Sequence, residues 1–345
     1  MPAETVRTGA APAADGRRSA DDAPAGPAAG THPGRVVAVL AVAAVAVLIL
    51  FLTLGALDAL DLILPLRAGR VAAMVVVGVA IAVSTVLFQT VTENRILTPA
   101  IMGFDSLYAL IQTAAVFFLG ATTVNGLAPT GRFAVEVAAM LVFSTALFRW
   151  IFGGPRRSLH LVVLVGIVFG VLFRSLATFL QRVIDPNEYL TVADRLFASF
   201  SAPDPTLLLV CTAVVALVCA WAWTRRRDLD VLALGRAHAV ALGVDHRRLT
   251  MAVLLVSALL VSVSTALVGP ITFFGLLVAN LAYQVAGTHR HAYVLPVAAL
   301  LAVITLVGGQ AVLEHVFGLD TVLSVVIEFL GGLVFIVLLV RGGTR

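Results

Sequence analysis

Five small or polar side chains recur every three or four residues along one apolar stretch of the chain: Gly166, Gly170, Arg174, Thr178 and Gln181. In a helix this spacing places all of them on one face. Two interpretations are open: the two glycines form a close helix-packing seam, or the whole face lines a translocation path. On a path, Arg174 would meet water or an anionic ligand, which offsets the cost of a charge at membrane depth.

Two acidic residues also lie within apolar stretches. Glu136 is expected at a depth similar to that of Arg174, so a buried ion pair between them is as good an interpretation of Arg174 as a place on a path. Glu328 lies in the last apolar stretch, and the sequence indicates no partner for it. A proton relay would need further acids at matching depth.

Catalytic and metal-binding patterns are missing from the sequence. HExxH, GxSxG and CxxC do not occur, and no histidines have the spacing of a metal site. Cys211 and Cys219 lie eight residues apart in one apolar stretch and are expected to be small packed residues. All 23 residues of the Lys and Arg class are arginine, so the chain has no Walker A lysine. We therefore expect no catalytic residue, metal or cofactor here, and any ATP-Mg would bind a separate ATPase chain.

The elements that position these residues are long apolar stretches. With 60% hydrophobic residues, 12% charged residues and a mean hydropathy of +1.04, the chain is predicted to be an all-α polytopic membrane protein. About ten transmembrane helices are expected, at 36–57, 67–90, 99–119, 132–151, 160–181, 205–223, 249–268, 270–285, 293–313 and 321–340. The eighth is short, and we expect it to be broken or tilted and packed inside the protein.

The distribution of arginine predicts the orientation. With the N-terminus inside, fourteen arginines fall in the inner loops and flanks and five in the outer ones, as the positive-inside rule requires. The chain is therefore expected in the cytoplasmic membrane with both termini cytoplasmic. Residues 1–34 lack apolar periodicity and are predicted to be a disordered cytoplasmic tail, whereas 35–345 form the membrane domain.

Two connecting loops are long enough to hold structure. The outer loop at 182–204 predicts a short amphipathic helix after Asp185-Pro186-Asn187, lying at the membrane surface, with five apolar residues at helical spacing: Leu190, Ala193, Leu196, Phe197 and Phe200. The inner loop at 224–248 predicts two short helices broken at glycine, with small residues and leucines that suit docking to another protein: Leu234, Gly235, Ala239, Leu242 and Gly243. An ordinary connecting loop is an equal alternative on composition alone.

Several motifs in this order resemble one family. LGRAHAVALGVD, followed by a span and GPITFFGLLVANLAY, is similar to the FecCD-type permeases of iron–siderophore ABC importers, a family that also contains the cobalamin permeases. Arginines before the second span (Arg67 and Arg70) and an Asn-x-x-x-x-Pro loop after it (Asn94 and Pro99) add to the resemblance, which runs from about residue 60 to the C-terminus. IDPNEY and TPAIMGF resemble the branch for catecholate or mixed-type siderophores, such as petrobactin or anguibactin.

The resemblance implies a two-permease membrane core, two cytoplasmic ABC ATPases that grip the inner loop, and an extracytoplasmic siderophore-binding protein. The second permease would be an identical or a sister subunit, and no nucleic acid is involved. Arg67 and Arg70 would then dock carboxylates of the binding protein, with snorkelling to the membrane interface as the alternative. The chain departs from the family at Ala279-Asn280, where Pro-His is common, and at Tyr283, where Arg is expected.

The function expected from the sequence is that of a permease subunit that moves ferric siderophores across the cytoplasmic membrane. One alternative is the same fold with cobalamin or haem as cargo. Another is an ion-coupled secondary transporter with a relay through Glu136, Arg174 and Glu328, and an intramembrane enzyme is the least favoured.

Overall fold

A computed structural model describes residues 32–54, 60–152, 159–201, 203–317, 325–329, 331–333 and 336. Its elements follow in the order α1 (Pro33–Thr53), α2 (Leu60–Thr92), η1 (Pro99–Met102), α3 (Phe104–Leu119), α4 (Ala121–Gly126), α5 (Pro129–Phe152), α6 (Leu159–Val183), α7 (Pro186–Leu196), α8 (Pro205–Thr224), α9 (Arg226–Leu232), α10 (Arg236–Ala241), α11 (His246–Val268), α12 (Phe274–Ala286), α13 (His291–Val312) and the π turn η2 (Leu313–Phe317). This described part is helical and contains no strand, as the apolar runs predict, because only a helix satisfies its backbone polar groups within one lipid-exposed segment.

Seven of the described helices are long and apolar enough to cross a membrane: α1, α2, α5, α6, α8, α11 and α13. The two shorter apolar helices α3 and α12 coincide with the predicted third and eighth spans. The predicted last span at 321–340 falls largely on residues outside the described part, so the number ten stays a prediction. Most of the predicted tail also lies outside it, although α1 already begins at Pro33.

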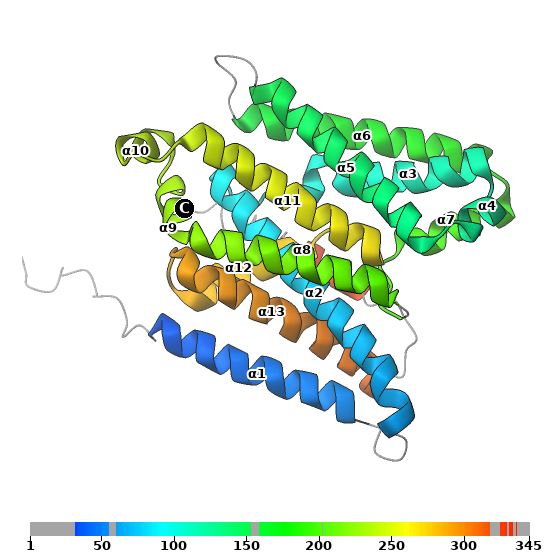
Figure 1. Cartoon of the computed structure of the whole chain (residues 1–345), viewed down its shortest axis with the longest axis horizontal. Coiled ribbons are helices and arrows are strands. Elements are labelled where there is room, and N and C mark those ends of the chain that lie inside the picture. Colours follow the sequence, from blue (N-terminus) through cyan, green and yellow to red (C-terminus); the bar gives the residue numbers. More distant parts are fainter. Residues whose placement is uncertain are drawn as a thin grey trace, which may run out of the picture. The chain divides into compact units, whose positions relative to one another are not determined.

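Helix α2 lies at the centre of one group of helices. It packs against α11 on one side and against α13 on the other, and α1 packs along α13 (Figure 1). In its most apolar window 78% of the residues are buried, against 11% for α1, which leaves α1 an apolar face suited to lipid. A second group consists of α3, α5, α6 and α7, and α11 joins the two groups through its contacts with α5.

The helical path of the chain is broken before α3 and again before α12, and the two breaks lie side by side, since Asp105 of α3 contacts Thr272. The predicted span 99–119 is divided at Gly103, whose φ of +89° is in the left-handed region that glycine adopts without strain. The predicted eighth helix is short and buried, as expected, but it starts only at Phe274, after an irregular segment at 269–273 that follows α11. Irregular backbone at membrane depth is stable only where it is buried in protein or lines a cavity.

The outer loop contains the predicted helix, α7. Asp185 caps the helix by accepting a hydrogen bond of 2.8 Å from the Asn187 N–H. The fully buried residue is Val192, which joins a small apolar cluster with Val116 and Val124, whereas Leu190 is 63% exposed. The apolar residues Leu190 and Phe197 are exposed, as on a helix that lies at a membrane surface, because the partners of α7 are α3 and α4 and lie on the Val192 side. A place at the membrane surface stays a prediction.

Candidate functional site

The inner loop folds as the two short helices predicted for it, α9 and α10. Gly235 precedes α10 with a φ of +89° and Gly243 follows it with a φ of +81°, so both positions need a residue without a Cβ. Three apolar side chains stand out from the loop, with exposed fractions of 57% for Leu234, 59% for Val240 and 63% for Leu242. We call these three residues the apolar loop surface.

Ala239 was predicted among the docking residues, but it does not lie on the apolar loop surface. Its exposed fraction is 0%, and it lies on the inner side of α10. Its small side chain therefore supports close packing of the helix instead of contact with another protein.

A polar link ties α9 to two membrane helices. Asp230 of α9 accepts two hydrogen bonds of 2.7 Å from His291, one from the backbone N–H and one from Nδ1. The other ring nitrogen, Nε2, lies 2.7 Å from Oγ1 of Thr90 in α2. Burial raises the pKa of Asp230, but the hydrogen bonds from His291 lower it by more, so the pKa lies below its ordinary value. The loop is thus held to the end of α2 and to the start of α13.

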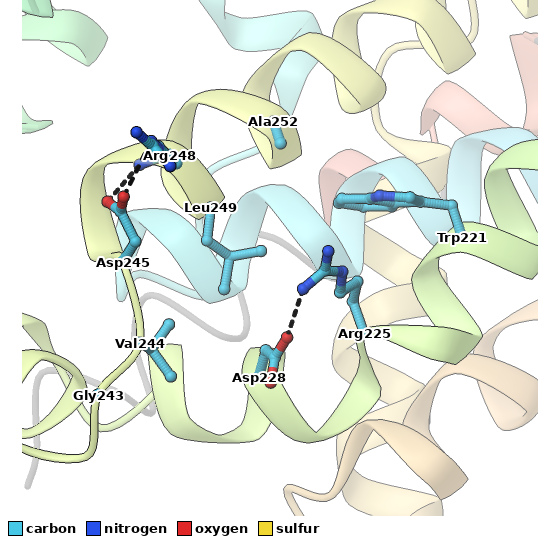
Figure 2. A pocket seen from close by; sticks show the side chains of 9 residues that line it. All are labelled: Trp221, Arg225, Asp228, Gly243, Val244, Asp245, Arg248, Leu249 and Ala252. Atoms are coloured by element: carbon cyan, nitrogen blue, oxygen red, sulfur yellow. Dashed lines mark hydrogen bonds and ion pairs between the residues drawn. The ribbon is translucent and has the colours of Figure 1, made fainter.

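A cavity of about 400 Å³ separates the loop from the ends of α8 and α11 (Figure 2). Arg225 donates to Asp228 at 3.0 Å on one side, and Arg248 pairs with Asp245 at 3.1 Å on the other. Asp245 also caps α11 by accepting from the Arg248 N–H. Exposed pairs of this kind contribute little stability.

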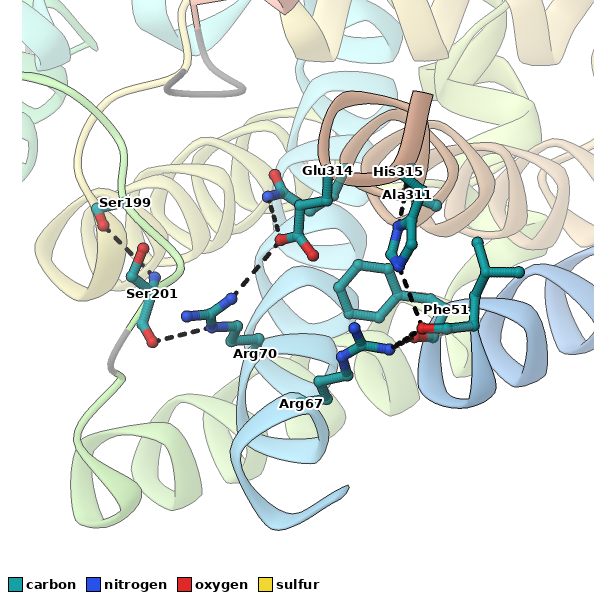
Figure 3. Close-up of polar contacts among 10 residues, drawn as sticks. Phe51, Arg67, Arg70, Ser199, Ser201, Ala311, Glu314 and His315 are labelled. Atoms are coloured by element: carbon teal, nitrogen blue, oxygen red, sulfur yellow. Dashed lines mark hydrogen bonds and ion pairs between the residues drawn. The ribbon is translucent and has the colours of Figure 1, made fainter. Parts of the chain in front are cut away.

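The two outer arginines are both engaged within the chain (Figure 3). Arg67 donates to the carbonyl oxygens of Phe51 at 2.9 Å and of Leu54 at 2.6 Å, at the end of α1. Arg70 donates to the carbonyl of Ser201 at 3.1 Å and lies 3.6 Å from the carboxylate of Glu314. The Arg70 side chain is still 36% exposed, so an external partner can reach it. Docking to a binding protein stays a prediction.

The predicted face of α6 divides into two parts. A Cβ on Gly170 would lie 3.0 Å from Cα of Gly103, and a Cβ on Gly166 would lie 3.1 Å from Cβ of Met102. Both glycines therefore form a packing seam with η1 and the residue after it, which supports the first of the two interpretations for them. Arg174 and Thr178 are exposed on the chain, and their place on a path stays a prediction.

Gln181 is the outermost member of the same face. Its side-chain amide donates to Oγ1 of Thr113 in α3 at 3.1 Å. This contact continues the α6–α3 packing toward the outer end of both helices. A place for Gln181 on the path also stays a prediction.

Glu136 is paired, but not with Arg174. Gln112 donates to its Oε1 at 2.6 Å, and Nε of Arg132, one turn earlier on α5, lies 3.5 Å from the same atom. Gln112 in turn accepts a hydrogen bond of 3.1 Å from Arg195 of α7. The structure therefore does not support the ion-pair interpretation of Arg174, because Gln112 of α3 and Arg132 of α5 already contact the Glu136 carboxylate.

The most informative residue that the sequence analysis missed is Asp105. It lies in the first turn of α3 and accepts a hydrogen bond of 2.8 Å from Thr272, in the irregular segment before α12. Glu328 and Arg174 lie close enough for their charges to act on Asp105. Asp105 could have been found from the sequence, because an acidic residue within an apolar stretch indicates a functional or paired group at membrane depth. The link between Asp230 and His291 gave no such signal, because 61 residues separate them.

Comparison with known proteins agrees with this arrangement. Residues 36–341 match the model of the FecCD transport family. The chain is 47% identical over 281 residues to the petrobactin import system permease protein YclO of Bacillus subtilis, covering 81% of this chain and 89% of the relative. It is 36% identical to the petrobactin import system permease protein FatC of Bacillus anthracis, covering 79% of this chain and 77% of the relative.

A solved structure shares the fold. An inward-facing conformation of a metal-chelate type ABC transporter superposes with a TM-score of 0.76 at 23% identity, covering 90% of this chain and 99% of that chain. With a family match over most of its length, the chain belongs to the FecCD transport family.

Proposed function

We propose that this chain is the permease subunit of an ABC importer that carries ferric siderophores across the cytoplasmic membrane. Family membership and the two relatives that are petrobactin permeases support this function and favour a siderophore of the petrobactin class. Cobalamin or haem as cargo is less favoured, because the relatives of higher identity are petrobactin permeases. A proton relay through Glu136 and Arg174 is disfavoured, since the Glu136 carboxylate already interacts with Arg132 and Gln112.

The apolar loop surface is the observation that carries the proposal. Val240 of α10, with Leu234 before this helix and Leu242 after it, is exposed on a loop that the Asp230–His291 link holds to α2 and α13. Apolar side chains on a short rigid helix suit a groove on another protein. In the proposed importer, that groove belongs to a separate ABC ATPase, one for each of two permeases.

The proposed arrangement follows the charge distribution. Ten transmembrane helices with both termini cytoplasmic place the apolar loop surface inside and the Arg67 and Arg70 end outside. An extracytoplasmic siderophore-binding protein would meet the outer end, where Arg70 remains partly exposed. The membrane core would consist of this chain and an identical or sister permease.

Transport would follow from movement of the loop as a rigid unit. ATP binding closes the ATPases, and the loop passes the displacement to α2 and α13 through Asp230 and His291. The exposed face of α6, with Arg174 and Thr178, and the outer segment at 182–204 would then change access to the central path. Arg174 would favour ferric complexes that carry negative charge.

A matched pair of variants tests the docking surface. Leu242→Asp places a charge on the apolar loop surface, and Leu190→Asp places one at the outer helix α7, where the leucine is equally exposed at 63%. Leu242→Asp should abolish copurification of the ATPase and uptake of iron-loaded siderophore, whereas Leu190→Asp should leave copurification unchanged. Equal copurification with both variants would contradict the proposed docking surface.

The energy source has its own test. An importer with a catalytically dead ATPase should lose uptake, and a protonophore should leave ATP-supported uptake in proteoliposomes unchanged. The opposite pattern would support an ion-coupled transporter and overturn the proposal.

A further inference from the structure

A small polar cavity lies among the helices where the two irregular segments meet. Its walls come from α2, η1, α3, α11 and the segment before α12. Six of its lining residues carry a side-chain oxygen: Thr85, Thr98, Asp105, Ser264, Thr265 and Thr272. The volume that the centre of a water-sized sphere can occupy in this cavity is about 20 Å³. A volume of this size suits a single water molecule or a single bare ion.

The oxygen atoms of this cavity have unused capacity to accept. Thr98 is 3% exposed, and its hydroxyl has no hydrogen-bond partner among the described residues. Ser264 and Thr272 direct their hydroxyl protons to the Val261 carbonyl and to Oδ2 of Asp105, which leaves the lone pairs of both oxygens available. Buried polar groups normally find a partner, so the Thr98 hydroxyl points to an occupant of this cavity. The free lone pairs of Ser264 and Thr272 can contact an occupant that carries positive charge.

The charges around the cavity favour the same kind of occupant. Asp105 contributes a carboxylate, and the charge of Glu328 on the last described helix adds to the negative potential there. Arg174 is the cation whose charge acts on Asp105, and it is exposed on α6. Arg174 is not among the residues that line the cavity, so a cation inside it would add compensating positive charge next to the buried carboxylate.

The chemistry of the lining selects among cations. Hydroxyl and carboxylate oxygens are ligands for hard cations. A divalent ion such as Mg²⁺ keeps several waters, which the cavity has no room for, and it favours more than one carboxylate. Breaks in transmembrane helices supply such sites in other membrane proteins, because unwound backbone exposes polar groups at depth.

We propose that this cavity, formed by Thr98, Asp105, Ser264 and Thr272, binds one dehydrated sodium ion that holds η1 and the segment before α12 together. The site lies beside the Gly103–Gly170 seam, so its occupancy would stabilise the packing of α6 as well.

The test compares thermal unfolding of the purified permease, together with its partner subunits, in NaCl, KCl and choline chloride at equal ionic strength. Sodium should raise Tm saturably, by about 2 °C at about tenfold excess over its Kd. Asp105→Asn and Thr98→Val should each abolish the sodium-dependent rise, whereas Thr98→Ser should retain it. Ser262→Ala is the matched control, because Ser262 is also buried on α11 with an unpaired hydroxyl but lies outside the cavity lining.

Two results would overturn the proposal. The first is a wild-type Tm that is the same in sodium and in choline, which would mean that water fills the cavity. The second is a sodium-dependent rise that persists in both Asp105→Asn and Thr98→Val. The wild-type comparison needs no variant, so it decides the matter even where a variant fails to fold. It also needs no siderophore or nucleotide, so its failure leaves the proposed transport function intact.

Discussion

The seam between α6 and the η1–α3 break makes a sharp prediction about Gly170. In Gly170→Ala the new Cβ would lie 3.0 Å from Cα and 3.4 Å from N of Gly103, whereas ordinary contact begins at 3.4 Å. The neighbour is backbone, so α6 must shift away by a few tenths of an ångström. Overpacking of this kind costs about 1–3 kcal/mol. Alanine in a helix regains about 0.5–1 kcal/mol relative to glycine.

The net expectation is a loss of about 1 kcal/mol in the free energy of unfolding for Gly170→Ala, or a fall in Tm of about 1–2 °C. Gly131→Ala in α5 is the control, because a Cβ there meets nothing within 4 Å. It should raise Tm slightly, so the two variants should differ in sign. Thermal unfolding of both in the same detergent measures this difference.

Siderophore uptake by the same variants separates packing from a direct role on a path. If Gly170 acts through packing, uptake by Gly170→Ala should fall together with Tm and recover at lower temperature. A stabilised Gly170→Ala protein would refute the seam argument. Unchanged Tm with lost uptake would instead place the glycine on the translocation path.

Three further predictions concern the loop and the outer end. Gly235→Ala and Gly243→Ala should each cost about 1–2 kcal/mol, because φ is positive at both positions; thermal unfolding measures this, and a cost no larger than that of Gly34→Ala would contradict it. Glu314→Gln should lower Tm by little, since a partly exposed pair contributes at most about 1 kcal/mol, but it should change the salt dependence of binding-protein affinity; an unchanged dependence would argue against docking at Arg70. The folded-state pKa of Asp230 is lowered, so its charge stabilises the protein above the unfolded pKa and ceases to do so as pH falls through the folded pKa. The Tm difference between wild type and Asp230→Asn should therefore be constant down to about pH 5 and shrink only in stronger acid; a difference that vanished near neutral pH would contradict the link to His291.

The sequence alone determined the features that depend on neighbouring residues. Long apolar runs required helices, and described helices coincide with the predicted spans up to 293–313. Glycines at 235 and 243 predicted the two short helices of the inner loop, because a positive φ is a local property. The family resemblance rested on such local motifs in order, and the comparisons confirmed it.

Only the tertiary structure decided which faces of these helices meet. The sequence placed Glu136 and Arg174 at similar depth. In the structure the rotation of the helices instead brings the Glu136 carboxylate into contact with Arg132 and Gln112. The contact of Asp230 with His291 and that of Asp105 with Thr272 join residues 61 and 167 positions apart. Apolar side chains on all sides of a membrane helix leave its rotation unspecified, so packing against other helices settles which polar groups find each other.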